Sequence, residues 1–162
     1  MQLSGMIRTI CPPDQLLALL NDPAVLAKIM PGGAEITQTS ATDYAVIIRK
    51  SFGPLKLNLS GTLGLTPIGS GYDRRLTAHA THAIAGKADI ALTIRLTADT
   101  GRTVLTYSGD LAATGLVGRL LGENGKRAQT SLRAIFLRLK TLAEGDKTLA
   151  SAKLQRKAGR KA

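Results

Sequence analysis

Between residues 55 and 66, apolar and polar side chains alternate so regularly that the segment predicts a β-strand. Its apolar face carries Leu55, Leu57, Leu59, Leu63 and Leu65, and its polar face carries Lys56, Asn58, Ser60, Thr62 and Thr66. Alternation with a period of two is typical of a sheet that has one face in water and one face against a core. The rest of the chain must therefore supply a cover for the leucine face.

Turn-forming residues divide the chain into further elements. Residues 3–7 alternate and predict a first strand, after which Pro12-Pro13-Asp14 opens a helix, because proline is tolerated in a first turn. Asn21-Asp22-Pro23 ends this helix, and Asp22 can cap a second short helix that reaches Ile29. Further strands are predicted over residues 35–40, 44–52, 74–83, 88–98 and 104–113.

Residues 116–144 predict one long helix. Its apolar stripe contains Ala128, Leu132, Ile135, Phe136, Leu139 and Leu142. Because Gly118, Gly122 and Gly125 weaken its first turns, we expect a loose or broken start. This helix is the only predicted element long enough to cover the sheet. The sequence therefore predicts one α+β domain over residues 1–144, in which a curved antiparallel sheet wraps around the long C-terminal helix.

Small residues at inward positions predict an apolar cavity between the sheet and this helix. Gly61, Ala78 and Ala80 take such positions, and the chain has no tryptophan to fill the space. The alternative is that these small residues pack tightly and leave no cavity. The predicted wall residues are Leu57, Leu59, Leu63, Ile90, Leu92, Leu116, Leu120, Leu132 and Phe136. Leu116 and Leu120 would form an apolar lip at the mouth, or else only a frayed helix start.

No catalytic or metal-binding constellation emerges from the sequence. His79 and His82 have an odd separation in one strand, which places them on opposite faces of a sheet. Cys11 has no histidine near it in sequence, so we interpret it as a packed thiol beside the first helix. The glycines around Gly122 fail the phosphate-loop pattern, since Arg127 stands where serine or threonine is needed after Lys126. We therefore expect a protein that is not an enzyme.

The chain is strongly basic, with a formal net charge of +11. A stripe at intervals of seven contains Arg119, Lys126, Arg133, Lys140 and Lys147. Beyond it, residues 145–162 form a basic tail that we expect to be flexible, with Lys153, Arg156, Lys157, Arg160 and Lys161. An anionic membrane surface fits these charges. Nucleic acid is a rival partner, but the strand faces lack an aromatic stacking platform. The alternative is a solvated helix face with a solubilising tail.

Cysteine content and hydropathy set the expected location. A single cysteine allows no internal disulfide, which favours a reducing compartment. No stretch approaches the ~20 apolar residues that span a bilayer. We expect a cytoplasmic protein that associates peripherally with the inner face of the cell membrane.

Several segments resemble the CoxG family of carbon monoxide dehydrogenase subunits over residues 1–142. They are Leu3-Ser4-Gly5, residues 20–26 with Met30-Pro31-Gly32, Phe52-Gly53-Pro54-Leu55-Lys56, Leu105-Thr106-Tyr107, and residues 115–120. The resemblance implies the helix-grip fold of the START and Bet v 1-like superfamily. The chain departs from the family pattern at Leu17, where many members carry tryptophan, and at Ile29 and Gly33, which replace a frequent cysteine pair.

The resemblance further implies an accessory protein of a molybdenum-containing dehydrogenase. Such a protein would carry a lipophilic ligand, a quinone or another lipid, in its cavity, would hold no covalent cofactor, and would help associate the enzyme with the membrane. A second hypothesis is a docking module without a ligand. A third is a small cyclase or hydrolase on the same fold, which would need a polar side chain such as Tyr107 or His79 in the cavity.

Overall fold

The computed structural model describes residues 1–30, 34–52, 54–120 and 126–160. Along the chain, the elements are β1 (Gln2–Thr9), α1 (Pro13–Asn21), α2 (Pro23–Ile29), β2 (Ala34–Gln38), β3 (Asp43–Phe52), β4 (Leu55–Pro67), β5 (Arg74–His82), β6 (Gly86–Asp99), β7 (Arg102–Ala113), α3 (Gly115–Leu120) and α4 (Lys126–Arg160). The predicted strand, two short helices, strand meander and C-terminal helix are confirmed.

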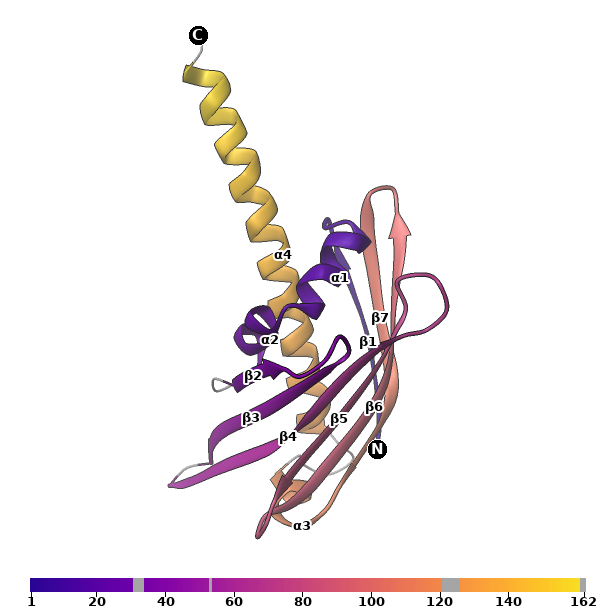
Figure 1. The fold of residues 1–162 in the computed structure, drawn as a ribbon, viewed down its shortest axis with the longest axis vertical. Coiled ribbons are helices and arrows are strands. Elements are labelled where there is room, and N and C mark those ends of the chain that lie inside the picture. The colour runs from indigo at the N-terminus through magenta and orange to yellow at the C-terminus, as the bar shows by residue number, and fades with distance from the viewer. Residues whose placement is uncertain (31–33, 53, 121–125, 161–162) are drawn as a thin grey trace.

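All seven strands form one antiparallel sheet in the order β1-β7-β6-β5-β4-β3-β2. Strands β2 to β7 are a meander, and β1 joins its far edge beside β7. The sheet curves, and α4 runs across its concave side together with α1 and α2 (Figure 1). This arrangement is the predicted helix-grip architecture.

Local sequence signals explain the two short helices. Pro13 occupies the first turn of α1, and Pro23 the first turn of α2. Asp22 caps α2, since its Oδ1 accepts a hydrogen bond of 2.9 Å from the Ala24 backbone N–H. This is the cap that the sequence predicts. It satisfies one of the backbone donors that a helix start leaves without an intrahelical partner.

The main core lies between the sheet and the helices. Along β6, Ile94 and Leu96 are buried and Arg95 is exposed, so the predicted alternation holds. Across this core, the rings of Tyr107 and Phe136 stack with their centroids 4.5 Å apart. Each large apolar side chain buried in this way contributes roughly 1.5–3 kcal/mol.

The C-terminal helical region differs from the prediction of one helix over residues 116–144. The structure has two helices, α3 and α4, and Gly122 and Gly125 lie outside the described residues between them. The backbone of α4 also continues past the sheet to Arg160 (Figure 1), through the segment expected to be flexible. Alanine, lysine, leucine and glutamine are strong helix formers, which accounts for this continuation. The division into a domain and a separate tail stays a prediction.

Among the helices of the described chain, none combines the length and apolar composition that a membrane span requires.

Candidate ligand-binding cavity

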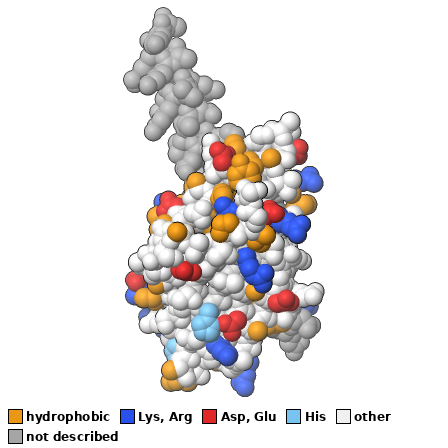
Figure 2. Space-filling model, turned by 45° about the vertical axis from the view of Figure 1, so that its right-hand side comes forward, with side chains coloured by type: hydrophobic (Ala, Val, Ile, Leu, Met, Phe, Trp, Pro, Cys, Tyr) orange, Lys and Arg blue, Asp and Glu red, His pale blue; other side chains and the backbone are white. Residues whose placement is uncertain are grey.

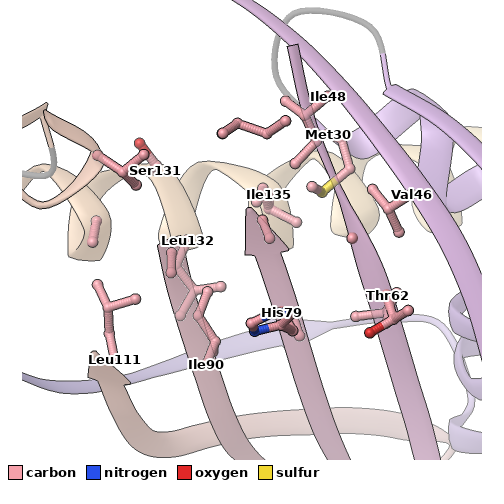
Figure 3. Close-up of a pocket in the computed structure, with 18 of the residues that line it drawn as sticks. Met30, Val46, Ile48, Thr62, His79, Ile90, Leu111, Ser131, Leu132 and Ile135 are labelled. Atoms are coloured by element: carbon pink, nitrogen blue, oxygen red, sulfur yellow. The ribbon is translucent and has the colours of Figure 1, made fainter. Parts of the chain in front are cut away.

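A cavity of about 240 Å³ lies between the concave face of the sheet and α4. Its walls come from helices and strands that are far apart in sequence. The sheet contributes Val46, Ile48, Leu59, Gly61, Leu63, Ala78, Ala80, Ala88, Ile90, Leu111 and Leu3, and the helices contribute Leu26, Val117, Ala128, Ser131, Leu132 and Ile135. Figure 3 shows how Leu132 and Ile135 of α4 lie across the cavity from strand residues such as Ile90 and Val46.

The strand register explains why the space is hollow. Three inward-facing rows cross the neighbouring strands β4, β5 and β6. The first row is Leu65, Leu76 and Leu92, the second is Leu63, Ala78 and Ile90, and the third is Gly61, Ala80 and Ala88. Side-chain volume therefore decreases stepwise along the sheet. The first row fills the core, whereas the third row leaves room above it.

Gly61 also has a backbone role at this position. A Cβ atom there would overlap the His79 carbonyl oxygen of the neighbouring strand. Glycine in a strand interior commonly marks a bend or a close backbone approach. The residue therefore lets β4 and β5 approach closely on the concave side, and it enlarges the cavity by lacking a side chain.

The cavity wall is apolar, and none of its described residues is aspartate, glutamate, lysine or arginine. Ser131 is the polar side chain that α4 contributes, and Figure 3 shows it at one end of the site. Thr62 and His79 also border the cavity, but both occupy outward positions of their strands. A wall of this kind suits the apolar surface of a small ligand, and its one hydroxyl group can orient that ligand.

The structure brings four predicted wall residues together at the cavity, namely Leu59, Leu63, Ile90 and Leu132. Two others lie in the core instead. Leu92 belongs to the first row, which fills the core, and Phe136 stacks on Tyr107. Leu116 packs against a small cluster around Val117. The side chains of Leu57 and Leu120 lie outside the described residues.

Sequence reasoning missed the wall residues from β3 and Ser131 of α4. Val46 and Ile48 share the inward parity of Tyr44, so the alternation of that strand could have found them. Ser131 lies between Ala128 and Leu132 on one helix face, where the spacing i, i+3, i+4 would have placed it.

The two histidines face opposite sides of the sheet, as expected. His79 Nδ1 contacts Asp89 Oδ1 on the outer face, where both side chains are about half exposed. His82 is partly buried, and its Nδ1 accepts hydrogen bonds from the backbone N–H groups of Ile84 and Ala85. Cys11 is buried in the core beside α1. Within the described ranges, no three histidine, cysteine or acidic side chains are grouped to hold a metal ion.

The basic residues are divided between two helices. Arg119 belongs to α3 and not to α4, so the stripe of a single helix begins at Lys126. Lys126 and Arg133 are exposed, and Lys140 is half-buried beside Arg8 and Glu144. Beyond residue 145, the structure does not describe the side chains of the residues predicted to bind a membrane or partner. These are Lys147, Lys153, Arg156, Lys157, Arg160 and Lys161.

Comparison with known proteins identifies the family of this chain. The sequence profile of CoxG, a subunit of carbon monoxide dehydrogenase, matches residues 5–142. The chain belongs to the CoxG family. The matched region includes all of the cavity-lining residues except Leu3.

Solved structures similar to this CoxG family member support the fold. A conserved protein from Geobacillus kaustophilus superposes with a TM-score of 0.76 at 19% identity, over 90% of this chain and 96% of that one. A STAR-related lipid transfer protein from Xanthomonas axonopodis has a TM-score of 0.61 at 14% identity, over 87% and 84%. Norcoclaurine synthase from Thalictrum flavum has a TM-score of 0.64 at 9% identity, over 91% and 96%. None of the curated proteins compared with the chain matches it significantly.

Proposed function

We propose that this protein binds a lipophilic ligand, a quinone or similar lipid, between its sheet and α4, as an accessory protein of a carbon monoxide dehydrogenase-type enzyme. The observation that carries the proposal is the apolar cavity of about 240 Å³ that the row Gly61, Ala80 and Ala88 leaves open. Membership in the CoxG family supports the accessory role. The name of the STAR-related neighbour supports a lipid as the class of ligand.

The size of the cavity fits a ring better than a whole lipid. An apolar cavity of about 150 Å³ is large enough to bind benzene, whereas pockets for drug-sized ligands begin at about 300 Å³. The cavity here lies between these limits, at about 240 Å³. A substituted quinone ring would fit within it, and a long isoprenoid tail would extend beyond it.

Burial of the ring would supply the binding energy. An aromatic ring that buries about 200 Å² of apolar surface gains roughly 5 kcal/mol before the costs of association. The Ser131 hydroxyl could donate a hydrogen bond to a quinone carbonyl and so orient the ring. Membrane association through the basic segment of α4 and transfer of the ligand to or from the dehydrogenase complete the proposal.

The direct test is mass spectrometry of an organic extract from gently purified protein that has been incubated with membranes. We expect a lipophilic compound near one molecule per chain. An empty extract would contradict the carrier role and would favour a docking module that holds no ligand.

A pair of variants ties the ligand to the cavity. Ala78→Phe places a ring in the hollow beside Leu63 and Ile90, and we expect it to reduce the extracted ligand at least tenfold. Thr77→Phe adds the same ring on the exposed outer side of the same strand and should leave the ligand in place. Equal loss of ligand in both variants would argue against this cavity as the site.

A further inference from the structure

The turn between β5 and β6 exposes an apolar side chain that the fold does not require there. Ile84 is 91% exposed, whereas the other exposed large hydrophobic residues of the described chain range from 39% to 48%. On the face in Figure 2, apolar side chains lie among charged ones of both signs. Turns favour glycine, proline, asparagine, aspartate and serine. Neither turn geometry nor core packing accounts for an isoleucine here.

Hydrogen bonds to a side chain and to α3 brace this turn. The Nδ1 atom of His82 accepts hydrogen bonds from the N–H groups of Ile84 at 3.2 Å and of Ala85 at 3.0 Å. The Val117 N–H donates to the Ala85 carbonyl oxygen at 2.8 Å, which fastens α3 to the turn. Gly86 has φ +104°, and a Cβ atom there would overlap the Thr114 carbonyl oxygen. The scaffold therefore presents Ile84 to the surroundings without a large entropic cost of ordering the turn.

The turn and the cavity share a wall. Ala85 and Val117 form a buried pair, against which Leu59 and Ala88 pack. Val117, Leu59 and Ala88 also line the cavity. A surface that contacts Ile84 would therefore lie next to the end of the cavity where the side chains are smallest.

The turn and the start of α3 carry basic charges, and the next acidic residue along β6, Asp89, contacts His79 on the outer face of the sheet. Segments 82–88 and 114–119 contain Lys87 and Arg119 and no acidic residue. Both side chains are exposed, and so is Lys56 near the β3–β4 turn at the same end of the sheet (Figure 1). A protruding isoleucine with flanking cations is complementary to an anionic lipid surface, where the apolar side chain enters the acyl boundary and the cations remain at the headgroups.

We propose that the β5–β6 turn is a membrane-inserting tip, with Ile84 as its wedge, which holds the cavity against an anionic lipid surface. One protruding side chain offers much less area than the ~800 Å² that each partner buries in a stable protein interface, which argues against a protein partner. Lipid molecules, in contrast, can pack around a single side chain. The inference rests on the proposed function in taking a membrane as the partner. It adds a contact site at the opposite end of the molecule from the basic C-terminal segment of α4, so a protein seated on the tip would point that segment away from the same membrane (Figure 1).

Fluorescence tests the tip directly, because the chain has no tryptophan. In the Ile84→Trp variant, we expect a blue-shifted emission and quenching by brominated lipids when vesicles of phosphatidylcholine with phosphatidylglycerol are added. The matched control is Ile68→Trp, which probes an exposed isoleucine between β4 and β5 at the opposite end of the sheet. Quenching that is absent at position 84, or equal at both positions, would overturn the proposal.

Charge substitutions give a second measurement on the full chain. We expect Ile84→Glu to weaken partitioning onto the same vesicles about tenfold, while Ile68→Glu has a much smaller effect. His82→Leu should also weaken partitioning because the turn loses its acceptor. His82→Asn should restore it, since an asparagine carbonyl can accept from the same N–H groups. Partitioning that is unchanged by Ile84→Glu would contradict the tip.

The tip and the proposed function can fail separately. Ligand extraction from the Ile84→Glu protein reports the cavity alone, and loss of vesicle binding with retained ligand assigns the defect to the tip. Conversely, quenching at position 84 in a protein that never holds a ligand would uphold the tip and contradict the carrier.

Discussion

Tyr44 shows how one side chain joins two layers of the molecule. It points inward from β3 with 1% of its surface exposed, and its hydroxyl donates a hydrogen bond of 2.7 Å to the Asn21 carbonyl oxygen. Asn21 ends α1, so this bond ties the corner between α1 and α2 to the sheet. Burial raises the pKa of Tyr44, and the nearby charge of Asp22 raises it further.

Removing this hydroxyl should weaken the fold measurably. We expect Tyr44→Phe to lower the free energy of unfolding by about 1–2 kcal/mol, because it leaves a partly buried carbonyl without its donor. Urea denaturation measures the change. Tyr72→Phe, at an exposed tyrosine, is the control and should have little effect.

The raised pKa also predicts a pH dependence. The unfolded chain loses phenolic protons near pH 10, before the folded chain does, so stability present below about pH 10 declines as the pH rises further. The decline should be shallower in Tyr44→Phe. Tyr107 also contributes to the decline, because burial raises the pKa of Tyr107 although the charge of Arg133 opposes this shift. Identical slopes in both proteins would show that Tyr44 does not carry the effect.

At the scale of elements, α4 protects an edge of the sheet. β1 is an edge strand, and the Gln129 side chain bonds its backbone as a neighbouring strand would. Gln129 Oε1 accepts from the Ser4 N–H at 3.2 Å, and Gln129 Nε2 donates to the Ser4 carbonyl oxygen. Farther along, Glu144 Oε1 accepts from the Ile10 N–H at 3.4 Å. These contacts close an edge that could otherwise pair with another chain.

The Gln129→Glu substitution tests this contact. It keeps the size of the side chain but replaces the donor with an oxygen that repels the Ser4 carbonyl oxygen and so displaces the whole side chain from Ser4. We therefore expect a loss of about 1 kcal/mol and faster hydrogen exchange at the Ser4 amide. Gln15→Glu makes the same change at an exposed position on α1. Unchanged exchange at Ser4 would mean that the amide contact contributes nothing to docking.

The elements could be predicted from the sequence to a greater extent than the site. Alternation located the strands, and Asp22 located a helix start, because both signals are local. The cavity followed from Gly61, Ala78 and Ala80, yet its opposite wall depended on strand register and helix rotation, which are set by contacts far apart in sequence. Leu92 and Phe136 have the right polarity for a wall, but they pack one row deeper than the cavity.

At the scale of the whole molecule, basic charge is concentrated at the C-terminal end. Residues 146–162 contain six basic residues and one acidic residue. The backbone of α4 carries this segment beyond the sheet, away from the end that holds α3 (Figure 1). We therefore expect that this charged segment can be removed without disturbing the cavity.

Removing residues 146–162 should reduce binding to anionic vesicles at low salt. Each basic residue near such a surface contributes ~1 kcal/mol, and salt screens this attraction. Cosedimentation of the truncated and full chains at two salt concentrations measures both effects. Equal binding by the two proteins would exclude the segment as a membrane contact, and retained ligand in the truncated chain shows that its domain is intact.

The pairing of β1 with β7 has a consequence for how the chain acquires its structure. β2 to β7 each pair with a sequence neighbour, but Leu3 of β1 lies opposite Gly109. During synthesis from the N-terminus, β1 is made first and waits for a partner made more than ~100 residues later, because domains complete their folding only as the chain emerges. The nascent chain must therefore keep the apolar side of β1 from aggregating until β7 and α4 arrive, and chaperone dependence should concentrate in that interval.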